Sequence, residues 1–278
     1  MFSEYSAIFI SMKYCRFQLD GTAQFGLVEA VAGSDVITRI LLKAPEEAGG
    51  ELEDLPSKRI APLPLAEAQL FAPVRPSKIV CIGRNYRDHA AELGHEIPVE
   101  PLIFLKPPSS VLAPGVAIRR PKISQRVDYE GELGVVIGKT CRQLSVQDDV
   151  RSYILGYTCV NDVTARDLQE KDGQWTRSKG FDTFCPVGPV VCDTLNPWAG
   201  VAVETRVNRE VRQQGNTLDF IFPLDVVIRH ISQVMTLLPG DLISTGTPKG
   251  VGPLIGGDVV EVTIPDVGTL KNSVVDDA

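Results

Sequence analysis

The stretch VDYEGELGVVIG, from Val127 to Gly138, is the most informative part of this chain. Its second half, LGVVIG, is the kind of apolar run that forms a buried β-strand. Its first half places Glu130 and Glu132 on one face of the same expected strand, because side chains two residues apart point the same way. Two ionised carboxylates about 5 Å apart repel by about 3 kcal/mol at an effective dielectric constant near 20. A strand that enters a core with such a pair needs something that offsets this repulsion.

Three environments would offset the repulsion between these two glutamates: solvent at a sheet edge, neighbouring Lys or Arg side chains, or a divalent cation. The alternate face of the strand carries Leu133, Val135 and Ile137, so that face is expected to be buried. Gly131 separates the glutamates, and glycine inside a strand often marks the close approach of a ligand or another backbone. The stretch alone leaves the three environments open.

Composition places the chain among globular proteins. It has 278 residues, of which 44% are apolar and 23% are charged, enough for one large domain or a medium domain with a small one. The formal net charge of −7, with no basic stripe to offset it, argues against nucleic acid as a partner. No apolar run reaches the roughly 18 residues that span a bilayer, so no membrane partner is expected.

The cysteines and the N-terminus bear on the compartment. Six cysteines occur without a C-x-x-C pair, several of them in apolar runs, so we expect buried, reduced thiols and a cytoplasmic protein. A zinc site is not expected, because none of the three histidines lies near a cysteine pair. The first residues lack the basic region and the cleavage site of a signal peptide. Met12 is an alternative candidate for the start, which would make residues 1–11 an extension.

The N-terminal part of the chain has short strand patterns. Residues 13–32 predict two strands joined by a turn at Asp20–Gly21, and Ser34–Ala44 fits either a strand or a helix. From Pro56 to Pro76 the chain has five prolines in 21 residues, which predicts an extended connector.

We place a domain boundary near Ala72, towards the end of this connector. Residues 1–72 then form a small N-terminal domain and residues 73–278 a larger one. The larger domain is predicted to contain many strands separated by Gly and Pro, and few helices, one of them within residues 222–240. This content predicts a β-rich α+β fold, built as a barrel or a folded-over sheet and not as a doubly wound sheet.

Three further stretches carry residues suited to chemistry. Asp162 follows a strand-like run, where an aspartate either caps the next helix or binds a metal. His89 and Glu92 lie three apart in a helical stretch, either as a surface ion pair or as a base oriented by a carboxylate. Lys179 lies in QWTRSKGFDTF, a loop in which a lysine is usually solvated. The stretch GTPKGVG, at 246–252, is not a phosphate-binding loop, because Gly-Lys-Ser/Thr is absent.

In their order along the chain, these pieces resemble the fumarylacetoacetate hydrolase family. The matching motifs are GRNYRDHAAE at 83–92, EGE at 130–132, NDVTARDLQ at 161–169, WTRSKGFDTF at 175–184 and TGTP at 245–248. Each motif is short, but their combination is specific, and the resemblance spans residues 78–274. The residues before it resemble the variable small domain of many bacterial members. The family fold that this implies is a mixed β-sandwich or roll with a small N-terminal domain.

The resemblance implies a metal centre. Family members bind one divalent cation through the two glutamates of E-x-E and the first aspartate of the N-D motif, which are here Glu130, Glu132 and Asp162. Mg²⁺ is the usual ion, with Mn²⁺ or Ca²⁺ as substitutes, and carboxylate oxygens suit such hard cations. The eponymous enzyme has a further aspartate ligand upstream of the histidine, whereas this chain has Asn85. We therefore expect three protein ligands, as in the acylpyruvase-like branch.

The resemblance also implies roles for other residues. His89 and Glu92 match a dyad that activates water, with the histidine taking the proton. Lys179 and Gln169 match residues that hold a substrate carboxylate or a developing oxyanion, and Thr247 matches a turn residue that contacts substrate.

A segment that orders over the site is also implied, from Asn85 to Pro98, with Asn85 and Tyr86 as substrate-binding residues. Arg166 is expected to support the local structure.

The implied activity is stabilisation of the enolate of a 2-oxo acid. The first hypothesis is Mg²⁺-dependent hydrolysis of a C–C bond in a β-diketo acid such as an acylpyruvate or fumarylpyruvate. The alternative uses the same enolate without water, as an oxaloacetate tautomerase or decarboxylase or an isomerase of unsaturated 2-oxo diacids. A third class is a metal- or ligand-binding protein without turnover. Relatives are commonly homodimers, so a homodimer is expected.

Overall fold

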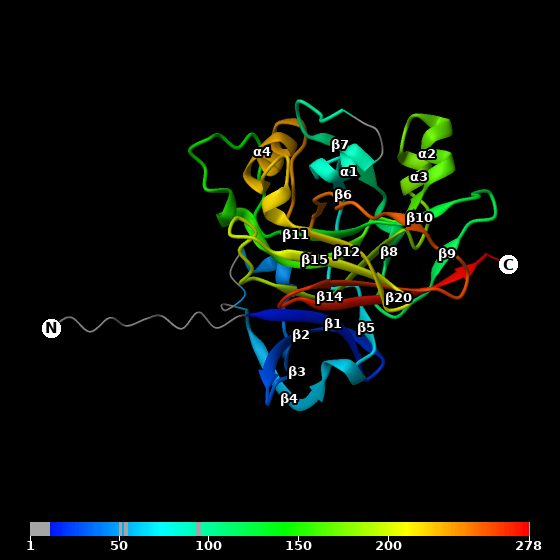
Figure 1. The fold of residues 1–278 in the computed structure, drawn as a ribbon. Coiled ribbons are helices and arrows are strands. Elements are labelled where there is room, and N and C mark those ends of the chain that lie inside the picture. The colour runs from blue at the N-terminus through cyan, green and yellow to red at the C-terminus, as the bar shows by residue number, and fades with distance from the viewer. Residues whose placement is uncertain (1–11, 50–51, 53–54, 93–95, 278) are drawn as a thin grey trace.

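The computed structural model describes residues 12–49, 52, 55–92 and 96–277. Within these residues the architecture is β-rich, as predicted, with three sheets and a few short helices around them (Figure 1). The expected extension over residues 1–11 lies outside the described residues.

The largest sheet runs through both parts of the molecule and has 12 strands in the described chain. Its main path, in spatial order, is β4 (Ser57–Pro64), β3 (Ser34–Leu41), β2 (Thr22–Val31), β1 (Lys13–Leu19), β14 (Cys185–Cys192), β12 (Ile154–Asn161), β11 (Gly131–Ile137), β17 (Leu242–Ser244), β6 (Ile79–Gly83) and β7 (Leu102–Lys106). Two short strands leave this path, since β5 (Leu70–Phe71) pairs with β1 and β8 (Val111–Leu112) pairs with β14. The antiparallel β1–β14 pair joins the N-terminal strands to the rest of the sheet.

Two smaller sheets and four α-helices complete the described fold. The second sheet has the order β16 (Glu210–Asn216), β15 (Ala202–Val207), β19 (Val259–Ile264), β20 (Gly268–Asp276) and β9 (Ile118–Arg120). The third has the order β13 (Thr164–Ala165), β10 (Val127–Tyr129) and β18 (Gly252–Pro253). The helices are α1 (Arg87–Glu92), α2 (Arg166–Asp172), α3 (Thr176–Lys179) and α4 (Leu224–Val234). In Figure 1, α4 and α1 lie at one end of the molecule and β1–β4 at the other.

The N-terminal strands follow the local sequence closely. Asp20 and Gly21 have φ values of +49° and +77°, and both residue types tolerate the left-handed region that a two-residue hairpin turn needs. The ambiguous stretch after Ser34 forms β3. The predicted connector is wrong in part, because Ser57–Pro64 forms β4 at the edge of the sheet. An edge strand tolerates proline, since one side of it has no ladder partner.

The opening stretch is not one continuous strand. It divides at Glu130 into β10, in the third sheet, and β11, in the largest sheet. Across the gap, the Glu130 N–H donates to Asn161 Oδ1 at 3.0 Å, and the Glu130 carbonyl accepts from the Asp162 N–H at 2.8 Å. The backbone of the glutamate therefore remains tied to the end of β12 while the strand passes from one sheet to the other.

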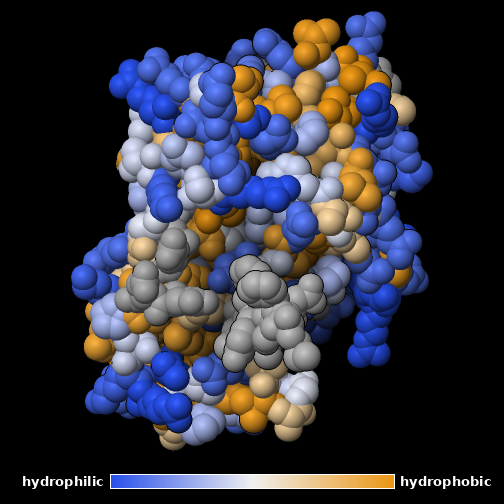
Figure 2. All heavy atoms as spheres, turned by 90° about the vertical axis from the view of Figure 1, so that its left-hand side faces the viewer, coloured by the Kyte–Doolittle hydropathy of each residue, from blue (hydrophilic) through white to orange (hydrophobic). Residues whose placement is uncertain are grey.

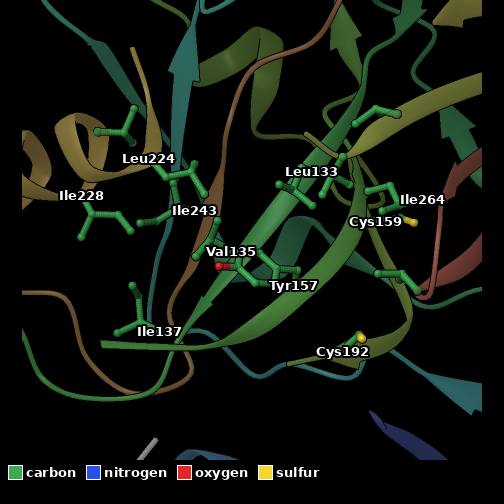
Figure 3. Close-up of a cluster of buried hydrophobic side chains, with 14 of the residues drawn as sticks. Leu133, Val135, Ile137, Tyr157, Cys159, Cys192, Leu224, Ile228, Ile243 and Ile264 are labelled. Carbon is green, nitrogen blue, oxygen red and sulfur yellow. The ribbon is translucent and has the colours of Figure 1, made fainter. Parts of the chain in front are cut away.

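The alternation expected for β11 holds in the core (Figure 3). Leu133, Val135 and Ile137 are fully buried, and they belong to the same hydrophobic cluster as Leu224 and Ile228 of α4. Full burial of one such aliphatic side chain contributes about 1.5–3 kcal/mol relative to exposure. The six cysteines are also buried, and no disulfide links the described residues, as expected for reduced thiols.

The surface is of ordinary mixed character where it can be seen. On the face in Figure 2, groups of hydrophobic residues alternate with hydrophilic ones, a common pattern because apolar atoms supply more than half of most protein surfaces. Among the helices of the described chain, none is both long and apolar enough to cross a membrane.

Candidate active site

Three buried carboxylates meet where β10 passes into β11 beside the end of β12. Glu130, Glu132 and Asp162 are 5%, 2% and 1% exposed, and one oxygen atom of each lies within 4.8 Å of the corresponding atoms of the other two. Because β11 lies between β12 and β17, the pair is not at a solvated sheet edge. Of the three environments that would offset the repulsion, cationic side chains and a divalent cation remain.

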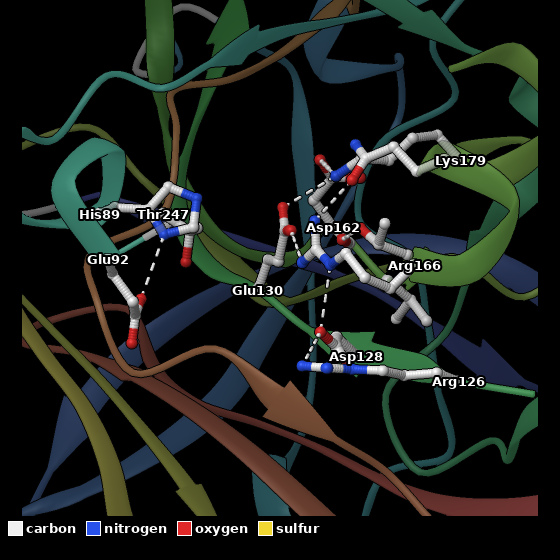
Figure 4. Close-up of polar contacts among 12 residues, drawn as sticks. His89, Glu92, Arg126, Asp128, Glu130, Asp162, Arg166, Lys179 and Thr247 are labelled. Atoms are coloured by element: carbon white, nitrogen blue, oxygen red, sulfur yellow. Dashed lines mark hydrogen bonds and ion pairs between the residues drawn. The ribbon is translucent and has the colours of Figure 1, made fainter. Parts of the chain in front are cut away.

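Cationic side chains neutralise two of the three carboxylates. Lys179 Nζ donates to Glu130 Oε2 at 2.8 Å and to Asp162 Oδ2 at 2.6 Å. Arg166 donates to Glu130 Oε1, and Lys106 Nζ donates to Asp162 Oδ1 at 2.6 Å. Figure 4 shows Glu130 between His89 on one side and Lys179 with Asp162 on the other.

Glu132 differs from the other two carboxylates, because it has no ion pair among the described residues. Its Oε2 accepts from the hydroxyl of Ser244 and from the Gly246 N–H at 2.8 Å, which are both neutral donors. Burial, together with the charges of Asp162 and Glu130, raises the pKa of Glu132 to about 8. A carboxylate in this position gains most from a cation, because its charge is the least compensated.

The ionisation of the other charged groups is set by their partners. Burial acts to raise the pKa of Glu130, but Lys179 and Arg166 hold it well below the usual range. Burial likewise acts to lower the pKa of Lys179, but Asp162 and Glu130 raise it above its ordinary value. Glu130 is therefore an anion and Lys179 a cation at neutral pH. Two of the three ammonium hydrogens of Lys179 are used by these carboxylates, which leaves one donor.

His89 and Glu92 face one another on α1. His89 Nδ1 lies 3.5 Å from Glu92 Oε2, and this nitrogen is buried with no hydrogen bond among the described residues. The carboxylate of Glu92 accepts from the Gly250 N–H at 3.0 Å, which ties α1 to the loop after β17. Burial lowers the pKa of His89, although Glu130 and Glu92 oppose this. The imidazole is therefore neutral near pH 7 and is able to accept a proton.

The predicted substrate-binding residues divide into two groups. Gln169 and Thr247 line the same cavity as His89, Lys179 and the three carboxylates. Gln169 Oε1 accepts from Arg166 at 2.7 Å, so its amide N–H₂ stays available. Thr247 Oγ1 donates to the Gly131 carbonyl at 2.9 Å and accepts from Gln213.

Asn85 and Tyr86 belong to the second group, since neither is among the residues that line the cavity. The Asn85 side chain is buried and bonds to the backbone, donating to the carbonyl of Thr245 at 2.8 Å and accepting from the N–H of Phe222 at 2.8 Å. The Tyr86 ring packs edge-on against Phe220 with centroids 5.0 Å apart. In this arrangement both residues anchor the start of α1.

Three local interpretations of the sequence require correction. Lys179 does not lie in a solvated loop: it is the last residue of α3 and is 2% exposed. Asp162 does not cap a helix: α2 begins at Arg166 with Ala165 at its N-cap, and the Asp162 carboxylate pairs with lysines. Gly131 makes room for a side chain and not for a ligand, because a Cβ atom there would lie 1.9 Å from Thr205 Oγ1 of β15.

Sequence reasoning missed three residues that complete the charge network. Lys106 is 1% exposed and ends β7; a single charge in the apolar run LIFLK was the available signal. Asp128 is fully buried and pairs with Arg166 and Arg126. Ser244, the donor to Glu132, comes from a distant strand, and no local pattern distinguishes it.

Taken together, three buried carboxylates, a neutral histidine and a charged lysine line one cavity. Residues 78–275 match the model of the fumarylacetoacetate (FAA) hydrolase C-terminal family, and residues 12–73 match that of the Rv2993c-like N-terminal family. The chain therefore belongs to the fumarylacetoacetate hydrolase family of enzymes.

Known relatives carry several activities. The chain is 41% identical over 272 residues to oxaloacetate tautomerase YisK of Bacillus subtilis, covering 93% of this chain and 89% of the relative. It is 40% identical over 281 residues to 2,4-didehydro-3-deoxy-L-rhamnonate hydrolase of Sphingomonas sp., covering 95% and 96%. The crystal structure of 5-carboxymethyl-2-hydroxymuconate delta-isomerase from Mycobacterium smegmatis superimposes with a TM-score of 0.85 at 39% identity, covering 96% and 100%.

Proposed function

We propose that this protein is a Mg²⁺-dependent enzyme that hydrolyses a C–C bond of a β-diketo acid of the acylpyruvate or fumarylpyruvate type. The observation that carries the proposal is the cavity itself, where Glu130, Glu132 and Asp162 lie beside His89 and Lys179. The similarity to a hydrolase of a didehydro-deoxy sugar acid supports the same reaction class.

The carboxylates fit a divalent cation. Their oxygen atoms are hard ligands at a suitable mutual separation, and Glu132 is buried without a cationic partner in the described chain. We assign Glu130, Glu132 and Asp162 as the ligands of Mg²⁺, with Mn²⁺ or Ca²⁺ as substitutes. When bound, the ion would act as a Lewis acid that stabilises negative charge on a 2-oxo acid enolate.

The side chains around the cavity account for the proton transfers. His89 accepts a proton from water, and Glu92 stabilises the imidazolium that forms. The resulting hydroxide adds to the distal carbonyl carbon, the bond from that carbon to carbon 3 of the 2-oxo acid breaks, and the electron pair remains as the enolate. The proton on His89 then passes to this enolate, which yields a carboxylic acid and the 2-oxo acid. Lys179 and Gln169 donate hydrogen bonds to the anionic oxygens.

A second candidate uses the enolate without water. The same base would take a proton from carbon 3 of oxaloacetate to give the enolate and return it to the oxygen on carbon 2, and the similarity to oxaloacetate tautomerase YisK over 93% of the chain favours this reaction. Decarboxylation of oxaloacetate passes through the same enolate.

One assay separates the two candidates. Purified protein is incubated with Mg²⁺ and one of four substrates: acetylpyruvate, fumarylpyruvate, keto oxaloacetate or enol oxaloacetate. The release of pyruvate and of the matching carboxylic acid is measured, and the enol form is followed by its absorbance. We expect pyruvate and the carboxylic acid in equal amounts from a β-diketo acid, and a loss of about 10²- to 10⁴-fold in His89→Ala. Tautomerisation of oxaloacetate without release of pyruvate from either diketo acid would overturn the hydrolase proposal in favour of the second candidate.

A further inference from the structure

Asp128 is a buried charge that lies outside the cavity. Its side chain is fully buried on β10, and it is not among the residues that line the cavity. Its carboxylate accepts from Arg166 Nε at 3.1 Å, and from Arg126 Nε at 2.9 Å and Arg126 Nη2 at 3.1 Å. Arg126 is the outer partner, since its side chain is 52% exposed. Because an ionised carboxylate is costly to bury, the inner partner, Arg166, indicates what Asp128 does.

The guanidinium of Arg166 connects Asp128 to the cavity. Besides its bond to Asp128, it donates through Nη1 to Gln169 Oε1 at 2.7 Å and through Nη2 to Glu130 Oε1. Figure 4 shows Arg166 between Glu130 and Asp128. A guanidinium is planar and rigid, with its donors at fixed angles. The bond of Asp128 to Nε therefore fixes the directions of the two donors that reach the cavity.

The contact with Arg166 sets the direction of the Gln169 amide. Gln169 lines the cavity, and the bond from Arg166 is the only hydrogen bond of its side chain among the described residues. With Oε1 held by Arg166, the Nε2 hydrogens are the end of the amide that is left for a ligand. If the amide turned over, it would present an oxygen atom to an anionic ligand and repel it. Recognition of an anionic oxygen by Gln169 therefore depends on the orientation of Arg166.

The start of α2 has a separate anchor that does not involve this guanidinium. The Asp167 carboxylate accepts from the Ser124 hydroxyl at 2.6 Å and from the Gln125 N–H at 2.9 Å. These bonds tie the first turn of α2 to the chain just before β10. Since Asp167 holds the backbone of the helix, the contact of Asp128 with Nε serves the orientation of the Arg166 side chain.

We infer that Asp128 is a positioning residue: through Arg166, it keeps the amide N–H₂ of Gln169 directed at the negatively charged oxygen of the substrate. The inference rests on the proposed function, in which Gln169 donates to the anionic oxygens, and it assigns a task to a residue that touches no substrate. The charge on the oxygen grows as the enolate forms, so the orientation of the donor matters most in the transition state.

A double-mutant cycle tests the path from Asp128 to Gln169. Asp128→Asn, which keeps the size of the side chain, is expected to lower kcat for fumarylpyruvate about 10-fold or more, with KM changed less than about threefold. Gln169→Ala should lower kcat to a similar extent. If Asp128 acts through Gln169, the double variant should lose no more than about threefold beyond the larger single loss. Losses that multiply in the double variant would overturn the inference.

Two further variants separate positioning from folding. Asp167→Asn weakens the other anchor of α2 and should lower the melting temperature, while kcat changes less than about threefold; a loss of kcat equal to that of Asp128→Asn would overturn the inference. Arg166→Lys keeps a positive charge beside Glu130 but lacks the planar fork. It should reproduce the loss of kcat and the coupling to Gln169, and it decides the question if Asp128→Asn does not fold. Full kcat in Arg166→Lys would contradict the inference.

A binding measurement makes the inference independent of turnover. Oxalate with Mg²⁺ serves as the probe, because it is a planar dianion with adjacent oxygens like those of a 2-oxo acid enolate. By calorimetry, the wild type should bind oxalate about 10-fold or more tightly than Asp128→Asn or Gln169→Ala, and the double variant should match the weaker of the two. If the wild type hydrolyses neither diketo acid but shows this pattern, the proposed function fails and the role of Asp128 stands. Equal oxalate affinity in the wild type and Asp128→Asn contradicts that role.

Discussion

The parallel strands β6 and β17 have a buried carboxylate at each end, and the two ends differ. At the start of the strands, Asp241 is fully buried and accepts from Ser77 and from the Lys78 and Leu238 N–H groups, and it also pairs with Lys78 Nζ. At the far end, Glu132 accepts from Ser244 and the backbone of Gly246 and has no cationic partner in the described chain.

This difference shows that burial of an acid does not by itself indicate a functional site. The carboxylate of Asp241 is balanced by a lysine and by backbone donors, and it fixes the loops that begin both strands. The carboxylate of Glu132 lies near two others and depends on neutral donors. A balanced buried acid stabilises the fold, whereas an unbalanced one marks a place where a ligand completes the charge.

The largest effect on activity is expected at Glu132, whose carboxylate has no cationic partner in the described chain. Glu132→Ala should lower activity by about 10³-fold or more, because it removes a proposed ligand of the cation that stabilises the enolate. The thermal stability of the metal-free protein should change little or rise, because the variant removes a buried acid whose ionisation the fold disfavours, as its raised pKa indicates. Steady-state rates and melting curves with and without Mg²⁺ measure both effects.

The shift of the melting temperature on adding Mg²⁺ provides the control for this variant. The wild type should gain stability from Mg²⁺, and Glu132→Ala should lose that gain. Full activity in the variant would contradict the metal assignment and, with it, the contrast between the two ends.

Asp241, whose carboxylate pairs with Lys78, should show the opposite pattern: a large effect on stability and a small effect on activity. Asp241→Ala leaves Lys78 and several backbone donors without their acceptor, so the free energy of unfolding should fall by about 3 kcal/mol. The kcat/KM of the folded protein should change only a few-fold, since Asp241 does not line the cavity. Urea denaturation and rates measured below the transition separate the two quantities. If Asp241→Ala kept its stability but lost activity, the structural role assigned to Asp241 would be wrong.

The smallest expected effect is on the pH profile. Burial lowers the pKa of His89, and Glu92 acts to raise it, so activity that needs the neutral imidazole should be lost as the pH falls through this lowered pKa. Glu92→Gln removes a negative charge and should move the acid limb of kcat/KM to lower pH, by less than about one unit. The profile is measured between pH 4.5 and 8, a range chosen to span the ordinary histidine pKa of about 6.5.

Asp88→Asn is the matched control for the pH measurement. Asp88 lies on the same helix but is exposed and pairs with Lys249, so the acid limb should stay in place. A shift to higher pH in Glu92→Gln would show that Glu92 does not stabilise the imidazolium.

Local patterns predicted some of the fold well. The hairpin at Asp20–Gly21 and the buried face of β11 depend on turn chemistry and on alternation, which neighbouring residues determine. The proline-rich stretch was misjudged because the tolerance of β4 for proline depends on its place at a sheet edge. The division of the opening stretch at Glu130 was missed because both halves have strand-like sequence, and partners far along the chain decide which sheet each joins.

The sequence by itself determined the kinds of groups at the site: three carboxylates in two short motifs, a histidine with a glutamate three residues later, and a lysine farther along the chain. Only the tertiary structure decided how their charges are balanced. It brought Lys106 and Lys179 to Asp162 and left Glu132 with neutral donors. The physical reason is that the ionisation of a buried group, and the hydrogen-bond donors or acceptors it has left, depend on neighbours from other strands. The spacing of residues along the chain does not reveal these neighbours.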